Sequence, residues 1–337
     1  MSSTESSAGR SVAEGLRDII QLVQDDLLEV EKLFERQVES DVALVGEIAR
    51  YVRDGGGKRI RPALLLLASR LCGYRGERAV LLAGVVEFIH SATLLHDDII
   101  DEATVRRGRR SVNSRWGNDI TVLLGDFLYT KSMSMALSQD NLPILRLLSD
   151  VTLRMIEGEL LEIESCADVD VTPEGHLDVI RRKTADLFAA CVRIGAMLGG
   201  VGEEKERALA SYGLNLGVCF QMVDDLLDYT ADARVLGKPV LNDVREGRVT
   251  LPAILLMQRT GERGRELVRR ALDDRDLDAG RADELLDLAR SSGALDEARG
   301  LAEQYAQAAR RDLLAFEASP FRDALEALPG FVLARDH

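Results

Sequence analysis

Two short segments of the chain carry three aspartates each in the same arrangement, Asp-Asp-x-x-Asp. They are Asp97, Asp98 and Asp101, and Asp224, Asp225 and Asp228. The first and last aspartate of each segment are four residues apart, so a helix would place them on one face with about 5–6 Å between their Cβ atoms. Carboxylate oxygens without Cys or His favour Mg²⁺, Mn²⁺ or Ca²⁺ over Zn²⁺.

A solvated acidic helix end explains one such cluster equally well, because acidic residues mostly lie on protein surfaces. Here, however, each cluster follows an apolar run, Ile89–Leu95 before the first and Leu214–Val223 before the second. Like charges at this spacing destabilise a helix, and a bound cation removes that cost. Two copies with the same apolar spacers therefore predict two Mg²⁺–diphosphate sites, in which phosphate and water complete the metal shell.

Cationic residues lie close to these aspartates in the sequence. Gly55–Gly57 leads into Lys58 and Arg61 at the predicted start of a helix, where backbone N–H groups and nearby cations favour phosphate. A second basic stretch, Arg106–Arg110, begins five residues after Asp101. Each basic side chain alone is most simply a solvated charge. Their pairing with the acidic clusters predicts two polyphosphate substrates held in one cleft.

The remaining titratable residues give weaker signals. Lys183 lies in a predicted helix, and Lys238 and Arg248 lie in the predicted loop after the second cluster. His90 precedes Asp97 by seven residues, or two helical turns, and is expected on the same face. His96 is expected to support the cluster or to lie in the core, and His176 to lie at the surface. The sequence contains no HExxH, GxSxG or GxxxxGK[ST] motif, which argues against zinc hydrolases, serine hydrolases and P-loop proteins.

Apolar periodicity predicts an all-α fold with almost no strand. The predicted helices cover residues 11–34, 42–51, 63–72, 79–101, 120–138, 143–164, 174–200, 203–230, 251–259, 262–273, 279–291 and 294–317. The stretches 105–115, 165–173 and 230–249 are predicted loops. We expect residues 1–10 to be a disordered tail and residues 11–337 to form one large helical domain.

Composition limits the classes of function. The net charge of −14 argues against non-specific nucleic-acid binding. Four scattered cysteines without a CxxC pair predict reduced thiols and a cytoplasmic protein. No uncharged apolar run reaches the roughly 18 residues that span a bilayer, so no transmembrane segment is expected. An apolar product would then leave through peripheral contact of the protein with a membrane.

Four stretches taken together resemble the trans-polyprenyl diphosphate synthase family: GGGKRIRP, EFIHSATLLHDDIIDEATVRRGR, RRKTADLF and QMVDDLLDYT…GKPVLNDVREGRVTLP. The similarity runs from about residue 20 to the end of the chain. It implies an isoprenoid synthase-like helical bundle around a central cavity, and a homodimer. It also implies Mg²⁺-dependent, head-to-tail condensation of isopentenyl diphosphate with an allylic diphosphate, a reaction that needs no nucleophilic side chain.

The resemblance also implies roles for individual residues. The expected Mg²⁺ ligands are Asp97, Asp101, Asp224 and Asp228, supported by Asp98 and Asp225. The expected isopentenyl diphosphate ligands are Lys58, Arg61, His90 and Arg107. The expected contacts of the allylic diphosphate are Arg106, Lys183, Thr184, Gln221 and Lys238. The chain departs from the family pattern at Arg248 (usually Lys, so still a cationic substrate-binding candidate), Arg110 (usually Pro) and Leu241 (usually Gly).

Two small residues before the first cluster, Ala92 and Thr93, bear on product length. Short-chain members of the family resembled carry a large aromatic residue there, which blocks the product tunnel. Small residues predict an open tunnel and a medium- or long-chain product. The candidates for a deeper tunnel floor are Leu128, Tyr129, Met133 and Ile156.

Four alternatives stay open at this point. One is a short-chain synthase that makes geranylgeranyl or farnesyl diphosphate. A terpene cyclase shares a DDxxD cluster, but it does not need the second diphosphate site that Lys58 and Arg61 indicate. An inactive partner subunit of a heteromeric synthase should have lost aspartates, and this chain keeps all six. A plain helical scaffold or Ca²⁺-binding protein lacks support, since the sequence has no EF-hand loop.

Overall fold

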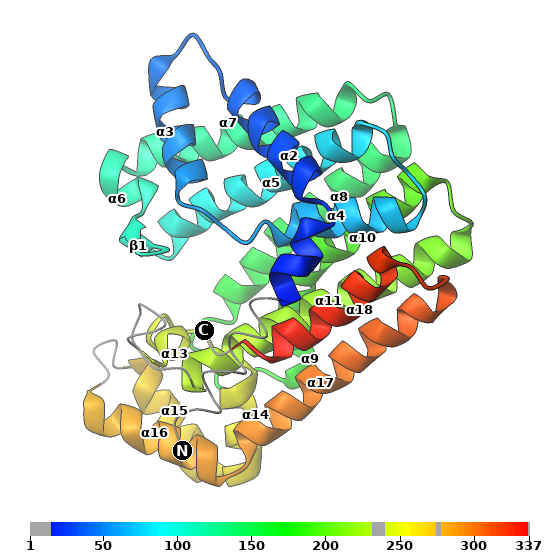
Figure 1. The fold of residues 1–337 in the computed structure, drawn as a ribbon. Coiled ribbons are helices and arrows are strands. Elements are labelled where there is room, and N and C mark those ends of the chain that lie inside the picture. Colours follow the sequence, from blue (N-terminus) through cyan, green and yellow to red (C-terminus); the bar gives the residue numbers. More distant parts are fainter. Residues whose placement is uncertain (1–14, 231–239, 274–277, 336–337) are drawn as a thin grey trace, which may run out of the picture. The chain divides into compact units, whose positions relative to one another are not determined.

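The computed structural model describes residues 15–230, 240–273 and 278–335, and nearly all of their regular structure is helical (Figure 1). The α-helices are α2 Gln24–Gln37, α3 Ala43–Asp54, α4 Ile60–Leu71, α5 Arg78–Ile100, α6 Val112–Trp116, α7 Asn118–Leu137, α8 Leu142–Glu164, α9 Pro173–Ile180, α10 Asp186–Gly199, α11 Glu203–Thr230, α13 Asn242–Arg245, α14 Leu251–Thr260, α15 Glu262–Asp273, α16 Ala279–Ser291, α17 Ala294–Asp312 and α18 Pro320–Leu333. This confirms the predicted all-α class.

The chain divides into two compact units, each assembled from three stretches of sequence. The first contains Met1–Thr152, Ala190–Ala210 and Ala315–Leu325, and the second contains Leu153–Ala189, Ser211–Leu314 and Glu326–His337. The expectation of a single domain over residues 11–337 stays a prediction.

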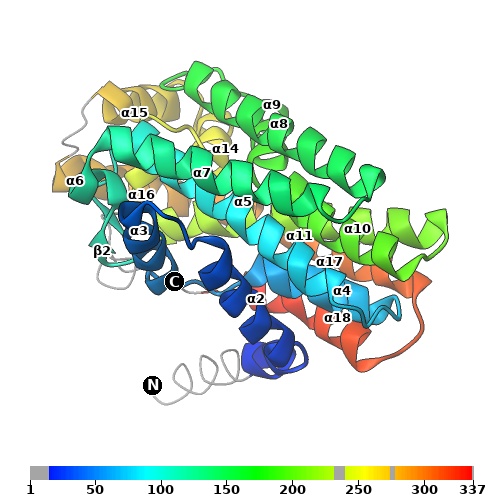
Figure 2. The ribbon, with the colours of Figure 1, turned by 90° about the horizontal axis from the view of Figure 1, so that it is seen from above.

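Helix α5 is the centre of the first unit. It packs against α2, α4 and α7, and both ribbon views show α5 and α7 side by side (Figures 1 and 2). Apolar residues surround most of α5, because neighbouring helices cover it on several sides. Phe88 of α5 lies against Phe34 of α2, with 4.4 Å between the ring centroids. This packing fixes the helix whose C-terminal end carries Asp97, Asp98 and Asp101.

Within the described residues, α5 is also the one helix whose length and composition would allow it to cross a membrane. Most of its apolar window, 67%, is buried inside the protein, which is what a core helix requires. A single helix of this kind is weak support for a membrane span.

Helix α14 is the centre of the second unit. Its residues Leu251–Met257 are all buried, and the helix packs against α9, α15, α16 and α17. Helix α11 supplies the second acidic cluster near its C-terminal end, and Tyr229 beside that cluster is almost fully buried. Aliphatic side chains and alanines fill both cores, in agreement with an aromatic content of only 4%.

The stretch 105–115, predicted to be a loop, is more ordered than expected. Strand β1 (Val105–Arg106) pairs antiparallel with β2 (Arg109–Arg110), and α6 follows at Val112. Arg107 and Gly108 between the strands have φ values of 51° and 72°, the two positive angles of a type I′ hairpin turn. Two-residue strands are too short to show an alternating pattern, so sequence periodicity missed them.

Three predicted helices are also interrupted or shortened. The first has a turn at Leu22–Val23 before α2. The predicted helix over 174–200 contains a π-helical segment, η1 (Arg181–Ala185). The last predicted helix ends at Asp312 and continues as the 3₁₀ turn η2 (Leu313–Ala315), after which α18 forms a further helix. π-Helical insertions occur frequently at functional sites, and η1 contains Lys183 and Thr184.

Candidate active site

The first acidic cluster lies at the C-terminal end of α5, where its three aspartates have different surroundings. Asp97 and Asp101 are half-buried, and the backbone N–H of Asp101 donates to the carbonyl of Asp97 at 2.8 Å. Asp98 is buried and forms an ion pair with the Arg106 guanidinium. Asp97 and Asp101 are therefore less buried than Asp98, and their expected role as Mg²⁺ ligands stays a prediction.

Burial raises the pKa of the Asp98 carboxyl above its ordinary value, and the facing Arg106 only partly offsets this effect. The side-chain amide of Asn113 also donates to the Asp98 carbonyl oxygen at 2.9 Å. Arg106 was expected to contact the allylic diphosphate, and that role stays a prediction. Its ion pair with Asp98 fixes the hairpin that follows the cluster to α5.

Two guanidinium ions, Arg61 and Arg107, and the imidazole of His90 lie together in the first unit, and we refer to them as the cationic group. The Nη1 atom of Arg61 lies 3.0 Å from Nε2 of His90. Burial, followed by the charges of Arg61 and Arg107, holds the pKa of His90 well below its ordinary value. His90 is therefore a neutral imidazole at neutral pH. Lys58 is exposed and lies two residues before the start of α4. The four predicted ligands of isopentenyl diphosphate therefore all lie in the first unit.

A steric constraint accounts for one glycine of the loop before Lys58. A Cβ atom on Gly57 would lie only 2.8 Å from Nη1 of Arg107, so a larger residue would displace that guanidinium. Arg107 itself has a positive φ, which a non-glycine residue adopts at a cost of about 1–2 kcal/mol. Its guanidinium has no hydrogen-bond partner among the residues that the structure describes. The hairpin turn and the glycine loop together position Arg107.

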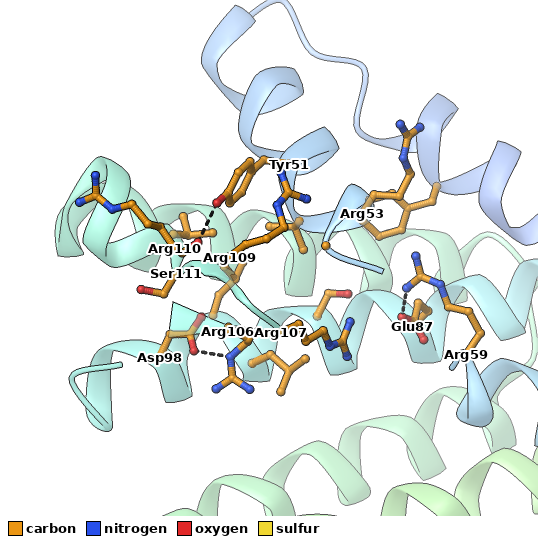
Figure 3. Close-up of a pocket in the computed structure, with 17 residues that line it drawn as sticks. Tyr51, Arg53, Arg59, Glu87, Asp98, Arg106, Arg107, Arg109, Arg110 and Ser111 are labelled. Atoms are coloured by element: carbon orange, nitrogen blue, oxygen red, sulfur yellow. Dashed lines mark hydrogen bonds and ion pairs between the residues drawn. The ribbon is translucent and has the colours of Figure 1, made fainter. Parts of the chain in front are cut away.

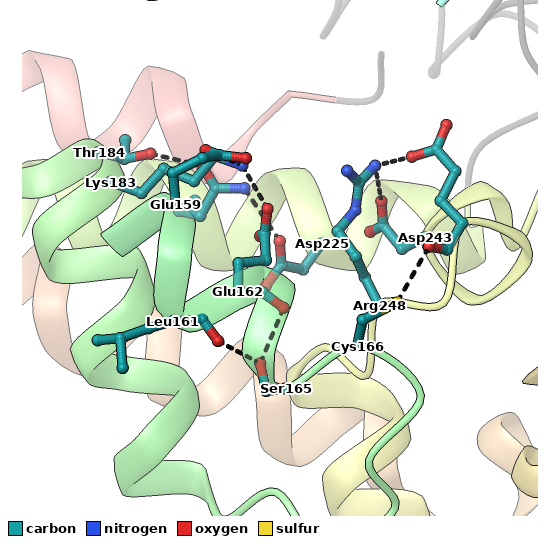
Figure 4. Close-up of polar contacts among 12 residues, drawn as sticks. Glu159, Leu161, Glu162, Ser165, Cys166, Lys183, Thr184, Asp225, Asp243 and Arg248 are labelled. Atoms are coloured by element: carbon teal, nitrogen blue, oxygen red, sulfur yellow. Dashed lines mark hydrogen bonds and ion pairs between the residues drawn. The ribbon is translucent and has the colours of Figure 1, made fainter. Parts of the chain in front are cut away.

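Asp225 of the second cluster is the buried centre of a polar network (Figure 4). Its Oδ1 accepts a hydrogen bond from Nε2 of Gln221 at 3.1 Å, and its Oδ2 lies 2.9 Å from Nε2 of His176. Thr184 donates to the amide oxygen of Gln221 at 3.0 Å. The prediction that His176 lies at the surface is wrong: it is only 8% exposed. A lone histidine in a polar stretch gave no signal of this partner.

Asp228 is also buried, and both of its oxygens are engaged. They accept the backbone N–H groups of Asn242 and Asp243 at 3.1 and 3.0 Å, at the start of α13. The carboxylate therefore caps a short helix. Its expected role as a Mg²⁺ ligand stays a prediction and would require it to share or leave these donors.

Leu241 precedes α13 and departs from the family pattern, which usually has glycine at this position. It has a φ of 57° and is completely buried. The left-handed backbone at this position accounts for the usual glycine. Here leucine occupies the same conformation and fills core space as compensation.

Asp224 is the exposed member of the second cluster, with 49% of its side chain accessible. Its Oδ1 accepts a hydrogen bond from Nη2 of Arg335 at 3.1 Å. The Arg335 guanidinium also stacks over the Phe220 ring at 4.5 Å. Sequence reasoning missed Arg335, because a basic residue near the C-terminus carries no motif.

Lys183 lies in the π-helical segment η1 and is held by two carboxylates of α8, Glu159 at 2.8 Å and Glu162 (Figure 4). Burial would lower the pKa of Lys183, but the two carboxylates outweigh burial and raise it. Lys183 is therefore fully charged at neutral pH. A Cβ on Gly158 would lie 2.8 Å from the Lys183 backbone nitrogen, so only glycine lets η1 approach α8 this closely.

Of the two basic candidates after the second cluster, the structure describes only Arg248. Arg248 is paired with Glu246 and, at 3.4 Å, with Asp243. Lys238 lies outside the described residues, and its role stays a prediction.

The residues predicted to control product length differ in burial and in the helix face on which they lie. Thr93 lies four residues before Asp97 and is half-buried, so it shares the face of that aspartate. Ala92 points to a different face of α5 and is only 3% exposed, within the core. Of the deeper candidates, Leu128 is fully buried and Tyr129 and Met133 are half-buried. Ile156 is 54% exposed on α8.

The carboxylates present fit a hard divalent cation. Asp97 and Asp101 supply carboxylate oxygens at the C-terminal end of α5, and Asp224 supplies an exposed carboxylate near the C-terminal end of α11. These candidate ligands are all oxygen donors, which hard cations prefer. In the described part of the chain, no three His, Cys, Asp or Glu side chains are arranged to hold a metal by themselves. Phosphate oxygens of a substrate would therefore have to complete the shell.

An all-helical fold with aspartates at the ends of two core helices, and cationic side chains beside them, defines a class of enzymes that act on prenyl diphosphates. The family model for polyprenyl synthetase matches residues 42–289. Octaprenyl diphosphate synthase of Escherichia coli K12 is 38% identical, over 95% of this chain and 99% of its own. A short chain isoprenyl diphosphate synthase of Methanothermobacter thermautotrophicus is 34% identical, over 86% of this chain and 90% of its own.

A solved structure gives the same result. The crystal structure of a polyprenyl synthase from Caulobacter crescentus CB15, complexed with calcium and isoprenyl diphosphate, matches with a TM-score of 0.91 and 37% identity. The match covers 96% of this chain and 98% of that one. The chain belongs to the polyprenyl synthetase family, and it is a prenyltransferase.

Proposed function

We propose that this chain is a medium- or long-chain polyprenyl diphosphate synthase, which joins isopentenyl diphosphate to an allylic diphosphate in the presence of Mg²⁺. The observation that carries the proposal is the cationic group Arg61–His90–Arg107, held in one unit with the carboxylates Asp97 and Asp101. A terpene cyclase has no second diphosphate to bind, so this group has no use in it.

Isopentenyl diphosphate would bind to Lys58, Arg61, His90 and Arg107. The guanidinium of Arg107 has donors to spare, because no described residue accepts them. The neutral imidazole of His90 can donate one hydrogen bond to phosphate and accept one from Arg61, which fixes its ring. Arg61 is half-buried, and an anion beside it would remove part of the cost of burying its charge.

The family resemblance assigns ligands of the Mg²⁺ that accompanies the allylic diphosphate to each acidic cluster. Asp97 and Asp101 of the first cluster and Asp224 of the second would hold Mg²⁺, or Mn²⁺, and Asp228 would bind metal only by giving up backbone donors of α13. When bound, the metal supplies positive charge that stabilises the departing diphosphate. Lys183, Thr184, Gln221, Arg106 and Lys238 are the proposed protein contacts of that diphosphate, and Arg248 an additional cation.

The reaction balances without a nucleophilic side chain. The allylic C–O bond breaks, and cationic side chains stabilise the negative charge that develops on the diphosphate. The isopentenyl double bond attacks the allylic carbocation, and a new C–C bond forms. The proton lost in the last step passes to the released diphosphate. The role of the protein is therefore to bind and orient two diphosphates and to exclude water from the cation.

Thr93 supports a medium or long product, because a small side chain shares a helix face with Asp97 where a larger one would obstruct a growing chain. We also propose a homodimer. Leu153, Ile156, Leu160 and Ile163 lie on one stripe of α8, and each is at least half exposed. Such a stripe is the seam of a helix pair, which a second copy of α8 would cover.

Two further proposals concern the cellular setting. All four cysteines are free thiols, which fits the reducing cytoplasm. Product release by peripheral contact with a membrane would suit an apolar product.

The decisive experiment is incubation of the purified protein with labelled isopentenyl diphosphate, Mg²⁺ and geranyl, farnesyl or geranylgeranyl diphosphate in turn. We expect chains longer than twenty carbons, no turnover in excess EDTA, and at least 100-fold less product from Asp97→Asn and Asp224→Asn. Products that end at farnesyl or geranylgeranyl diphosphate would assign a short-chain synthase instead. Absence of any isopentenyl incorporation would refute the proposal.

A further inference from the structure

An arginine, Arg59, lies between two proposed ligands of isopentenyl diphosphate, Lys58 and Arg61. Its backbone is left-handed, with a φ of 45° and a ψ of 37°, and its carbonyl accepts the first hydrogen bond of α4, from Ala63 at 3.0 Å. Arginine is unusual there, because helix N-caps favour Ser, Thr, Asn or Asp, and a left-handed backbone favours glycine. A position that breaks both local rules indicates a separate role for the side chain.

The Arg59 side chain joins the helices α2 and α5. Its Nε donates to Oε1 of Glu31 on α2 at 2.6 Å, and its Nη2 donates to Oε2 of the same carboxylate at 3.3 Å. Its Nη1 forms an ion pair with Glu87 of α5, which Figure 3 shows as a dashed line. One guanidinium is therefore held by two carboxylates from different helices, and we call these residues the Glu31–Arg59–Glu87 triad.

The buried part of the triad is its contact with α5. The Glu87 side chain is only 7% exposed, and that of Arg59 is 17% exposed. Burial raises the pKa of the Glu87 carboxyl, and the charge of Arg59 opposes this effect. Removing one partner of such a pair leaves the other charge buried and uncompensated. Each side chain therefore holds the other in place.

Two contacts attach the start of α4 to one face of α5. Glu87 and His90 are three residues apart on α5, so they lie on the same side of that helix. Arg59 pairs with Glu87, and Nη1 of Arg61 lies 3.0 Å from Nε2 of His90. Contacts one helical turn apart on α5 fix both the position and the direction in which α4 leaves the glycine loop.

We propose that Arg59 and Glu87 are positioning residues of the isopentenyl diphosphate site, acting through Lys58 and Arg61. The inference rests on the proposed function, which assigns Lys58, Arg61 and His90 to that substrate. The triad holds the left-handed turn that places Lys58 before α4 and Arg61 in its first turn. Donors that are already in place when the diphosphate arrives cost less entropy on binding. Loosening this turn should therefore weaken binding of isopentenyl diphosphate, while the allylic diphosphate, whose proposed ligands lie in other segments, is little affected.

A second ion pair of the same unit provides a matched control. Arg70, near the C-terminal end of α4, donates from Nε to Asp26 of α2 at 3.1 Å, and these side chains are 14% and 21% exposed. Asp26→Asn therefore removes an ion pair of similar burial that also joins α2 to the α4 segment, but at the end of α4 opposite Lys58. If the triad only stabilised the fold, Glu31→Gln and Asp26→Asn would have equal effects on the kinetic constants.

The first test compares the KM values of the two substrates. Initial rates are measured with isopentenyl diphosphate varied at saturating farnesyl diphosphate and Mg²⁺, and then with farnesyl diphosphate varied. Glu87→Gln should raise the KM for isopentenyl diphosphate at least tenfold, and the more exposed Glu31→Gln at least threefold, because pre-organised donors are lost. Both variants should leave the KM for farnesyl diphosphate within about twofold. Asp26→Asn should leave both constants within about twofold, because separate sites act independently.

The variant Arg59→Gly separates positioning from stability. Glycine adopts a φ of 45° without strain, so Arg59→Gly should have a higher Tm than Arg59→Ala. Both variants lack the ion pairs, and both should show the same raised KM for isopentenyl diphosphate. Arg59→Lys, which keeps the charge, should recover part of the affinity. A wild-type KM in Arg59→Gly would overturn the inference, because the turn would then need no side chain to hold it.

Calorimetry of isopentenyl diphosphate in excess EDTA separates this inference from the proposed function, since metal-bridged binding is absent there. The Kd should rise at least tenfold in Glu87→Gln and stay within about twofold in Asp26→Asn. If this pattern occurs in a protein that forms no prenyl product, the proposed function is refuted and the positioning role stands. If the enzyme makes polyprenyl products but Glu87→Gln binds as tightly as wild type, the positioning role alone is refuted. A wild-type protein that does not bind isopentenyl diphosphate refutes both.

Discussion

The Nε2 atom of His176 lies 2.9 Å from Oδ2 of Asp225, and both side chains are buried. Gln221 holds the other oxygen of the same carboxylate, so Asp225 cannot rotate. Its neighbour Asp224 is exposed. The buried aspartate therefore fixes the end of α11 from which the exposed one projects.

We predict that His176→Ala lowers kcat by 10- to 100-fold, the usual effect of removing a group that orients a metal site. The concentration of Mg²⁺ that gives half-maximal rate should rise, because the end of α11 loosens. The free energy of unfolding should fall by about 1–3 kcal/mol, since a buried acceptor loses its partner. His176→Asn, which can still donate, should recover part of the rate. His96→Ala is the control, and an equal loss there would argue against a specific role for His176.

The low pKa of His90 predicts an acid-labile fold. Burial and nearby arginines hold its folded pKa below the unfolded value near 6.5, so the unfolded state binds the proton more readily. The stability contribution is complete above about pH 6.5 and is lost as the pH falls toward the folded pKa. Wild type should lose up to about 1.4 kcal/mol per pH unit over this window relative to His90→Gln. Denaturant titrations at pH 5–7 measure the difference, and parallel curves would contradict it.

The cysteines should differ sharply in reactivity. Cys166 is exposed, whereas burial raises the pKa of Cys191 and Cys219 to about 12 and that of Cys72 to about 11. At pH 8 iodoacetamide should label Cys166 first, because the thiolate is the reactive form. Mass spectrometry after timed quenching measures the order, and unfolded protein should label at all four sites.

The thiols of Cys72, Cys191 and Cys219 predict a loss of stability at high pH. Burial raises their folded pKa values above the unfolded value near 8.5, so the folded state keeps these protons to higher pH. Their contribution is complete below about pH 8.5 and declines as the pH rises above it. Cys219→Ala should show a weaker decline in unfolding free energy between pH 8 and 10. An unchanged slope would contradict the assignment.

Product length should respond to Thr93 and not in the same way to Ala92. Thr93→Phe places an aromatic ring on the face of Asp97 and should shorten the main product by at least two isoprene units. Ala92→Phe overfills the core and should mainly destabilise the protein, by about 1–3 kcal/mol. Chromatography of the products and thermal unfolding separate the two effects. Unchanged products from a folded Thr93→Phe variant would remove Thr93 from the tunnel.

The exposed stripe on α8 predicts a dimer that charge can break. Ile156→Glu combined with Leu160→Glu places two carboxylates in the proposed seam, and light scattering should then report the monomer mass instead of the dimer mass. Glu157→Gln, on another face of α8, should leave the dimer intact. A wild-type protein that is already monomeric would refute the homodimer.

Local sequence patterns were enough to predict the all-α class, most helix positions and the candidate site residues. These depend on local rules: apolar periodicity, glycine and proline breaks, and carboxylates one helical turn apart. The spacing of His90, Thr93 and Asp97 already placed them on one helix face. The resemblance to a known family rested on the same local motifs, and the comparisons with known proteins confirmed it.

Long-range packing sets which members of each acidic cluster are buried, and local sequence patterns do not show this. Asp98 and Asp225 are buried by partners 8 and 49 residues away, Arg106 and His176, while Asp224 pairs with Arg335, 111 residues away. The π-helical turn at Lys183 lies close to Gly158, and the guanidinium of Arg107 lies close to Gly57. Partners so distant in sequence leave no periodic signal, because packing of whole helices brings them together.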